Sequence, residues 1–332
     1  MNVLLLVESL DHADISHAFY SNALSELGHT VHVGTVNSLG WRDETFTIKW
    51  GPVTGRVEPY GPFPHEARLA PVPELDVVWL LNQPHPRLSV DVWQMLWRWN
   101  QRQPFVNDIT GLLMLNNKNN LPLVVPPQNL PRSTGSNDAD VFLRQLKENP
   151  HQKWILKRPN GGCGADVFIL SPGDSNNRAL VQSLTGNTMA LSEMTEPSLV
   201  GLQAQQAVLQ EHIPHAAEKR IVVSSGDVVA AQEKALTAGD HRGNMTQGAK
   251  MQLSEPTMGE HELALTVSRR LLEYGIRFAG LDVAYPYVFE VNLVNPGGLV
   301  ERLELGLPDP YMGPVLDKLV RLSAGAGSVS VK

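Results

Sequence analysis

The strongest constraint on the fold is a strand-rich stretch, Phe278–Gly298, in which polar residues recur at regular spacing. It reads FAGLDVAYPYVFEVNLVNPGG, with two short apolar runs, Gly280–Ala284 and Val288–Leu293, on either side of a Tyr-Pro-Tyr turn. This pattern predicts a β-hairpin whose Pro286 lies where the ladder requires no N–H donor.

The spacing of this hairpin assigns its residues to two faces, because alternate side chains of a strand point the same way. With the turn centred on Pro286, Asp282 lies opposite Glu290 and Gly280 lies opposite Asn292, all on one face. The other face is expected to point into a core and carries Leu281, Val283, Phe289, Val291 and Leu293.

The polar face has two interpretations. Two facing carboxylates repel each other unless a cation lies between them. The oxygen atoms of Asp282, Glu290 and Asn292 suit a hard cation such as magnesium, which binds through one or two carboxylates together with phosphates and water. The alternative is that Asp282 and Glu290 are simply solvated. The hairpin alone favours the metal and leaves both open.

Composition narrows the class of protein. The chain has 332 residues, 42% hydrophobic and 18% charged, which is enough for two or three domains. A net charge of −7 does not suggest a nucleic-acid or membrane-surface binder. A single cysteine, Cys163, excludes an intrachain disulfide, and no signal peptide or membrane span is evident. A cytoplasmic protein is therefore expected.

The first half of the chain has the pattern of an open α/β domain. Asn2–Glu8 and Val31–Val36 are predicted strands on either side of a helix at Ile15–Leu27, and Leu75–Leu81 is a further buried strand. No Gly-x-Gly-x-x-Gly loop is present, so dinucleotide binding is not favoured. Gly51–Pro73 is rich in proline and glycine and is expected to be irregular.

The first predicted strand-to-helix junction carries a cluster of polar residues. These are His12, Asp14, Ser16 and His17. Such junctions often bind ligands in α/β sheets, but Asp14 alone is enough to cap the helix. Capping is the favoured interpretation.

A second informative stretch, Trp154–Leu170, reads WILKRPNGGCGADVFIL and predicts strand, glycine-rich turn, strand. It is not a Walker loop, since no Gly-Lys-Ser/Thr follows. A glycine-rich hairpin can close over phosphates, and Lys157 would add a charge beside them. Glycine also serves turns for steric reasons alone, so both interpretations stay open.

The order of motifs in the second half then becomes recognisable. After the glycine-rich turn come Gln-Glu-His-Ile, Glu-Lys-Arg, Arg-Gly-Asn, Gly-Leu-Asp and Glu-Val-Asn. This order resembles the ATP-grasp superfamily, in particular the bacterial glutathione synthetases, over most of the chain from about Leu75 to Leu305. The resemblance implies an α/β fold of the α+β ATP-grasp type, with an N-terminal open α/β domain (1–120). Two ATP-grasp lobes follow (121–208 and 209–332), with ATP between them.

The resemblance also implies roles for individual residues. Those expected at the ATP phosphates are Lys118, Lys157, Gly161, Gly162 and Gly164. Those expected at the adenine and ribose are Gln210, Glu211, His212, Ile213 and Glu218. Arg220 and Arg242 would lie near the transferred phosphoryl group. Arg242, oriented by Asn244, is the first choice for stabilising the acyl phosphate and the tetrahedral species. Asp282, Glu290 and Asn292 would hold two magnesium ions, for which manganese can substitute.

The implied reaction is that of an ATP-dependent carboxylate–amine ligase, which forms an amide through an acyl phosphate and releases ADP and phosphate. Its partners would be a small-molecule carboxylate and an amine, and the family forms homo-oligomers, dimers or tetramers. Alternatives are a non-catalytic ATP-binding regulatory module and a carboxylate kinase that releases its acyl phosphate.

The substrate segment departs from the family pattern. Where the family has Thr-Ser-Pro-Thr and then Gly-Ile-Arg-Glu, this chain has Val294-Asn295-Pro296-Gly297 and then Gly298-Leu299-Val300-Glu301. The family arginine is missing, and Arg302, two places further on, is the residue that could replace it. A specialised biosynthetic ligase that does not make glutathione is therefore as plausible as a glutathione synthetase. The residues expected at the substrates are Lys250, Asn295, Gly297 and Gly298.

Overall fold

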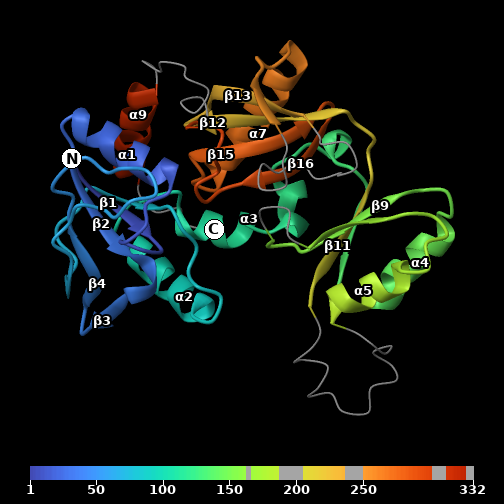
Figure 1. Cartoon of the computed structure of the whole chain (residues 1–332), viewed down its shortest axis with the longest axis horizontal. Helices are drawn as coiled ribbons and strands as arrows, with labels where there is room; N and C mark the ends of the chain where they lie inside the picture. Colours follow the sequence, from blue (N-terminus) through green and yellow to red (C-terminus); the bar gives the residue numbers. More distant parts are fainter. Residues whose placement is uncertain (162–165, 187–204, 236–249, 301–311, 327–332) are drawn as a thin grey trace.

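The computed structural model describes residues 1–161, 166–186, 205–235, 250–300 and 312–326. The described chain contains three β-sheets, which follow one another in sequence. The N-terminal and C-terminal sheets lie side by side, and the central sheet projects away from them (Figure 1). Within the described ranges, no helix is both long and apolar enough to cross a membrane.

The N-terminal sheet has the order β3-β4-β2-β1-β6-β7, with β5 paired to β4. Its strands are β1 (Asn2–Val7), β2 (Thr30–Thr35), β3 (Gly40–Arg42), β4 (Thr45–Pro52), β5 (Arg68–Pro71), β6 (Val77–Leu80) and β7 (Phe105–Val106). Its helices are α1 (Ile15–Glu26), α2 (Ser89–Asn100) and α3 (Ile109–Leu115). Strands β2, β1, β6 and β7 are parallel, which confirms the predicted β-α-β opening. Asp14 caps α1 by accepting the His17 N–H, as expected.

The central sheet has four strands in the order β10-β9-β11-β8. They are β8 (Ser133–Ser136), β9 (Trp154–Lys157), β10 (Val167–Leu170) and β11 (Ala207–Glu211), with helices α4 (Ala139–Glu148) and α5 (Asn177–Thr185). Short 3-10 turns η2 (Lys118–Leu123) and η3 (Pro127–Asn129) precede it, and η1 (Val36–Ser38) lies in the N-terminal part. The expected boundary between the two ATP-grasp lobes, at residues 208 and 209, falls inside β11. The three domain ranges remain a proposal.

The C-terminal sheet has five antiparallel strands in the order β14-β13-β12-β15-β16. They are β12 (Ala217–Ser224), β13 (Asp227–Ala235), β14 (Lys250–Leu253), β15 (Phe278–Ala284) and β16 (Tyr287–Asn292). Helix α7 (Met258–Glu273) packs against β12, β13 and β15, with Ala264, Val267 and Leu271 buried. Helix α9 (Met312–Ala324) returns to pack against α1 (Figure 1).

Two apolar cores join the N-terminal sheet to the C-terminal sheet, and the central sheet has a core of its own. One core combines residues of the N-terminal sheet with the α7 face of the C-terminal sheet. In a second core, Tyr20 and Trp79 stack with ring centroids 4.7 Å apart, and Phe278 of β15 meets both rings edge-on. The third core contains only residues between Ala139 and Leu209. The N-terminal and C-terminal sheets therefore form one packed body.

One buried amide, Asn107, ties the end of β7 to the base of the C-terminal hairpin. Its Oδ1 accepts the backbone N–H groups of Arg277 and Phe278 at 2.7 and 2.8 Å. Its Nδ2 donates to the carbonyls of Phe278 and Leu293 at 2.7 and 2.9 Å. All four hydrogen-bonding positions of the amide are used, so it fixes both strands relative to the N-terminal sheet.

Two expectations are corrected. Phe289 does not point into the core, because a β-bulge between Asp282 and Val283 pairs Val283 with Val288 and leaves Phe289 as the extra residue. Val288 is fully buried in its place. The stretch Gly51–Pro73 is not wholly irregular, since it contains β5, whose prolines lie in or beside an edge strand.

The Asn107 contacts predict a large loss of stability in Asn107→Leu. The substitution leaves two N–H and two carbonyl groups buried without partners, at about 1–3 kcal/mol each where water cannot replace the amide. We expect the free energy of unfolding in urea to fall by at least about 3 kcal/mol. Asn149→Ala, which removes one hydrogen bond to Gln145 at the end of α4, is the control and should cost about 1 kcal/mol. Equal losses in the two variants would contradict the assignment.

Candidate functional site

The predicted pairing of the hairpin is confirmed. Asp282 pairs with Glu290, and Gly280 pairs with Asn292. Strand β12 places Arg220 opposite Asp282, and β13 places Gln232 opposite Arg220. A row of polar side chains therefore crosses four strands, on the face opposite α7.

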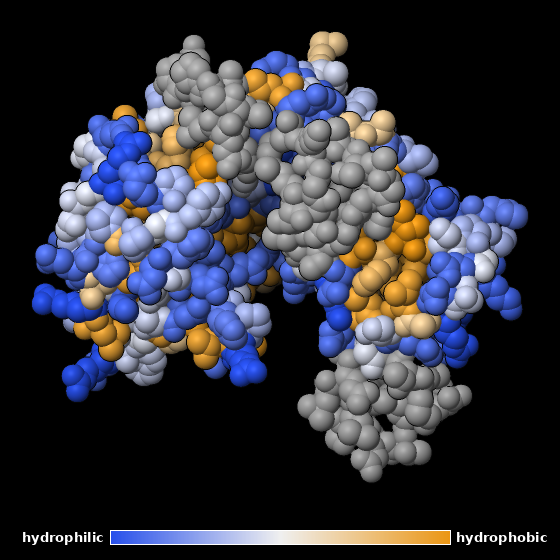
Figure 2. Space-filling view, in the orientation of Figure 1, coloured by the Kyte–Doolittle hydropathy of each residue, from blue (hydrophilic) through white to orange (hydrophobic). Residues whose placement is uncertain are grey.

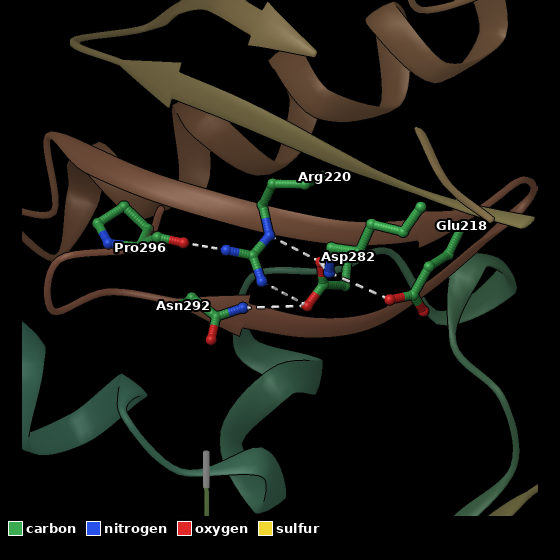
Figure 3. Close-up of polar contacts among 6 residues, drawn as sticks. Glu218, Arg220, Asp282, Asn292 and Pro296 are labelled. Carbon is green, nitrogen blue, oxygen red and sulfur yellow. Dashed lines mark hydrogen bonds and ion pairs between the residues drawn. The ribbon is translucent and has the colours of Figure 1, made fainter. Parts of the chain in front are cut away.

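Arg220 and Asp282 form the centre of this row (Figure 3). Arg220 donates from Nε and Nη2 to the two carboxylate oxygens of Asp282, at 2.7 and 2.9 Å. Its Nη1 donates to the carbonyl of Pro296. Asn292 donates to the same carboxylate at 3.2 Å. The planar guanidinium is thus held in a fixed, bidentate orientation.

Lys234 is a site residue that sequence reasoning missed. Its Nζ lies 2.8 Å from Asp282 Oδ1 and 3.1 Å from Glu218 Oε1, and the side chain is buried. The sequence shows only that Lys234 lies on the same strand face as Gln232. Its partners, Asp282 and Glu218, come from other strands and cannot be read from the local pattern. Glu218, expected at the ribose, is therefore paired with Lys234.

Burial and charge act in opposite directions on these groups. Burial would raise the pKa of Asp282, but the charges of Arg220 and Lys234 outweigh it and hold this pKa well below its usual range. Burial would lower the pKa of Arg220, but Asp282 raises it overall. Burial, and next the charge of Asp282, raise the pKa of Glu218. The centre is therefore a neutralised network of buried charges.

Lys118 links the beginning of the glycine-rich turn to the hairpin. Its Nζ donates to the carbonyl of Gly161 at 2.6 Å and lies 2.9 Å from Glu290 Oε1. The structure thus brings Lys118, Gly161 and Glu290 together. Gly162 and Gly164 lie outside the described residues.

Lys157 crosses from the central sheet to the hairpin. Its Nζ donates to Gln210 Oε1 at 2.9 Å and to the carbonyl of Phe289 at 3.3 Å. Burial lowers the pKa of Lys157 to about 8, against the opposing effect of Glu290. The face of the central sheet that carries Lys157 and Gln210 is therefore turned toward the C-terminal sheet.

This face of the central sheet is otherwise apolar. Register places Ile155, Val167, Ile169 and Val208 on it beside Lys157 and Gln210. The opposite face, with Leu156 and Leu209, belongs to the core of the central lobe. Apolar side chains gather over this sheet in the space-filling view (Figure 2). The sheet face turned toward the hairpin is thus largely apolar and carries one buried lysine, Lys157.

The predicted hinge begins in the last two residues of β11, Gln210 and Glu211, and ends at Ile213. Glu211 accepts a bidentate pair from Arg132 at 2.8 and 3.1 Å, and this hydrogen bond lowers the pKa of Glu211. The N–H groups of Glu211 and His212 donate to Arg132 and Lys153 within the lobe. The N–H of Ile213 donates to no other group among the described residues. Of the four hinge residues, Ile213 is therefore the one whose backbone N–H has no acceptor in the part of the chain that the structure describes.

The substrate segment packs behind Arg220. A Cβ at Gly298 would lie 2.6 Å from Arg220 Cγ, and one at Gly280 would lie 2.9 Å from Arg220 Cδ. Gly297 and Gly298 also have positive φ angles of 63° and 93°. The side chain of Asn295 is held by the N-terminal domain, with Ser16 Oγ 2.8 Å from its Oδ1. Arg242, Asn244 and the side chain of Lys250 lie outside the described part of the chain.

The donor set of the hairpin fits a magnesium ion that arrives with phosphates. Two carboxylates and one amide share a face, and all offer oxygen. In the described ranges, no group of three or more His, Cys, Asp and Glu side chains could hold a metal. Phosphate oxygens would therefore have to complete the coordination.

Comparison with known proteins decides the family. The model of the prokaryotic glutathione synthetase ATP-grasp domain matches residues 125–305, more than half of the chain. The chain belongs to this family. The predicted recognition, the ATP-grasp fold class and the assignment as an ATP-grasp ligase are confirmed.

Glutathione synthetases match this chain at low sequence identity. The glutathione synthetase of Synechocystis sp. is 26% identical over 335 residues, 92% of this chain and 95% of the relative. That of Bradyrhizobium diazoefficiens is 31% identical over 185 residues, 55% of this chain and 54% of the relative.

Solved structures share the fold of this family member at lower identity. The macrocyclase MdnC of Microcystis aeruginosa MRC, bound with its precursor peptide MdnA, has a TM-score of 0.61 at 15% identity, over 98% of this chain and 100% of its own. The D-cycloserine synthetase DcsG has a TM-score of 0.63 at 12% identity, over 97% and 100%.

The charge network predicts unequal effects of two isosteric substitutions. Asp282→Asn leaves the buried Arg220 and Lys234 without their shared counter-charge, which should cost about 3–5 kcal/mol. Glu290→Gln removes the ion-pair partner of Lys118, and the Glu290 side chain is 27% exposed, so the expected loss is about 1 kcal/mol. Urea unfolding without nucleotide measures both, and a loss for Glu290→Gln as large as that for Asp282→Asn would contradict the network.

Proposed function

We propose that this protein is an ATP-dependent carboxylate–amine ligase that forms an amide bond through an acyl phosphate, releasing ADP and phosphate. The observation that carries the proposal is the meeting of three chain segments at one place. Lys118 from the 3-10 turn η2, Lys157 from the central sheet and the Asp282–Glu290 pair of the C-terminal hairpin surround one small region. Alternating cations and carboxylates of this kind suit a metal-bound triphosphate.

The rest of the space between the lobes suits a nucleoside. The apolar wall of Ile155, Ile169 and Val208 would support the adenine ring, whose edge would pair with the hinge backbone at Glu211 and Ile213. Glu218 would accept hydrogen bonds from the ribose. Lys118, Lys157 and the glycine-rich turn at 161–164 would hold the phosphates.

Asp282, Glu290 and Asn292 would hold magnesium, two ions in this proposal. When bound, magnesium would neutralise the phosphate charge that develops during transfer. The chain's own contribution is to place cations, because phosphoryl transfer depends on positioning and charge stabilisation more than on a protein nucleophile.

The proposed reaction has two steps. A carboxylate oxygen of the acid attacks the γ-phosphorus of ATP, the bond to ADP breaks, and an acyl phosphate forms. The amine nitrogen then attacks the acyl carbon, the bond to phosphate breaks, and the nitrogen loses a proton. Arg220, with its fork already oriented, would stabilise the charge on the transferred group. Arg242 and Asn244 are proposed to assist, and Lys250 to contact a substrate.

One structural feature favours a ligase with substrates other than those of glutathione synthesis. The family arginine in Gly-Ile-Arg-Glu corresponds to Val300, which is 1% exposed and packs with Leu299 in the core shared with the N-terminal domain. The side chain of Val300 is apolar and buried, so it cannot pair with a substrate carboxylate. We therefore propose a specialised ligase of glutathione synthetase type as the second candidate.

The direct test is a screen for phosphate release over a matrix of acids, including γ-glutamyl dipeptides, and amines, including glycine. We expect magnesium-dependent release of ADP only when a suitable acid and amine are present, and a hydroxamate when hydroxylamine replaces the amine. Formation of AMP, or no ADP with any pair, would contradict the proposal. Acyl phosphate released without amide would indicate a carboxylate kinase. Asp282→Asn should abolish turnover, and unchanged biological activity in it would support a regulatory module.

The pKa of Lys157 predicts a pH dependence of nucleotide affinity. Below about pH 8 Lys157 is charged and ready for phosphate, whereas above about pH 8 it must take up a proton on binding. The dissociation constant of a non-hydrolysable ATP analogue with magnesium should therefore rise, approaching tenfold per pH unit, as pH increases above about 8.

Calorimetry in two buffers of different ionisation enthalpy measures both this affinity and the proton uptake. Lys157→Met is the control, and it should bind weakly with no such pH dependence. A flat profile for the unmodified protein, or the same slope in Lys157→Met, would show that another group controls binding.

A further inference from the structure

We propose that the first strand-to-helix junction of the N-terminal domain positions Arg220, acting through Asn295 and the carbonyl of Pro296. The inference rests on the proposed function, in which Arg220 acts on the transferred group. Asp14, Ser16 and Asn295 are then positioning residues, since they act through Arg220.

The junction holds Asn295 by two side chains. Asp14 caps α1 with Oδ1, which accepts the His17 N–H at 2.8 Å, and its Oδ2 accepts Asn295 Nδ2 at 3.3 Å. Ser16 Oγ lies 2.6 Å from Asp14 Oδ1 and 2.8 Å from Asn295 Oδ1, so its single proton serves one of the two. The cap that the sequence predicts thus uses its second oxygen to hold a residue of the substrate segment.

The next residue transmits this position to Arg220. Asn295 has a φ of 45°, and the carbonyl of the following Pro296 accepts from Arg220 Nη1 (Figure 3). The far end of the segment is fixed as well, because Leu299 and Val300 are buried in the core shared with the N-terminal domain. The carbonyl of Pro296 is therefore held from both sides.

Arg220 needs the Pro296 carbonyl as a second acceptor because Asp282, its first acceptor, also binds other groups. Asp282 also accepts hydrogen bonds from Lys234 and Asn292, and it is a proposed magnesium ligand. A carboxylate that divides its lone pairs among several cations orients each of them less strictly. The Pro296 carbonyl, whose position does not depend on Asp282, then fixes the direction of the guanidinium.

The first test removes the Asn295 side chain. In Asn295→Ala we expect the Nε–H NMR signal of Arg220, assigned by its loss in Arg220→Lys, to shift and broaden in the nucleotide-free protein. With a substrate pair from the screen, kcat should fall about 10-fold to 100-fold, while the KM for ATP changes less than about threefold. Asn129→Ala is the matched control, because Asn129 donates to the carbonyl of Pro286 at the other end of the same hairpin. It should change neither readout.

The second test exchanges donor and acceptor. In Asp14→Asn, the amide of Asn295 meets a second amide at position 14. In Asn295→Asp, the carboxylate of Asp14 meets a second carboxylate at position 295. Each single variant should therefore disturb the Arg220 signal. The double variant Asp14→Asn/Asn295→Asp restores one donor and one acceptor and should recover the signal and kcat. If Asn295→Ala does not fold, Ser16→Ala and this exchange carry the test.

An unchanged Arg220 signal in Asn295→Ala, an equal effect of Asn129→Ala, or no recovery in the double variant would overturn the inference. If the unmodified protein turns over no acid and amine pair, the proposed function fails by itself. The NMR signal still decides whether the junction positions Arg220.

Discussion

The bidentate ion pair between Arg220 and Asp282 is the interaction on which the rest of the site depends. Two opposite charges removed from water are tolerated only when their geometry is good and their remaining hydrogen-bonding positions are filled. Both conditions are met here by neighbouring strands. The register of β12 and β15 sets the two groups opposite each other, while Lys234, Asn292 and the Pro296 carbonyl fill the remaining positions. Gly280 and Gly298 leave the space in which the arginine lies.

The packing of the N-terminal and C-terminal sheets against each other holds the Arg220–Asp282 pair rigidly. The N-terminal and C-terminal sheets share two cores and the Asn107 joint, so the charged row stands on one packed body. The central lobe has its own core and reaches the hairpin through Lys157. The proposed triphosphate site therefore lies between two separately packed bodies, with Lys118 in the 3-10 turn η2 that precedes the central sheet. In this account the nucleotide replaces ion pairs that the protein already makes with itself.

Much of this arrangement follows from the sequence. The two-residue period of a strand was sufficient to predict that Asp282 faces Glu290, and Asp14 was predictable as a helix cap. What the period cannot show is a bulge, which moved Phe289 out of the core, or the partners of a residue on other strands, which is why Lys234 was missed. The tie from Ser16 and Asp14 to Asn295 joins residues some 280 positions apart, and no local pattern indicates it. The proline-rich composition of Gly51–Pro73 also led to the prediction of an irregular segment. It contains β5, because an edge strand tolerates proline.

We propose that Asp282 stays neutralised by Arg220 and Lys234 until a metal-bound nucleotide arrives. Titration with Mn²⁺, followed by electron paramagnetic resonance, is the most direct test. We expect negligible Mn²⁺ binding to the nucleotide-free protein. We expect clear binding with a non-hydrolysable ATP analogue, beyond what the analogue binds alone, and loss of that binding in Asp282→Asn. Tight binding without nucleotide, or binding in the presence of the analogue that Asp282→Asn leaves unchanged, would contradict this proposal.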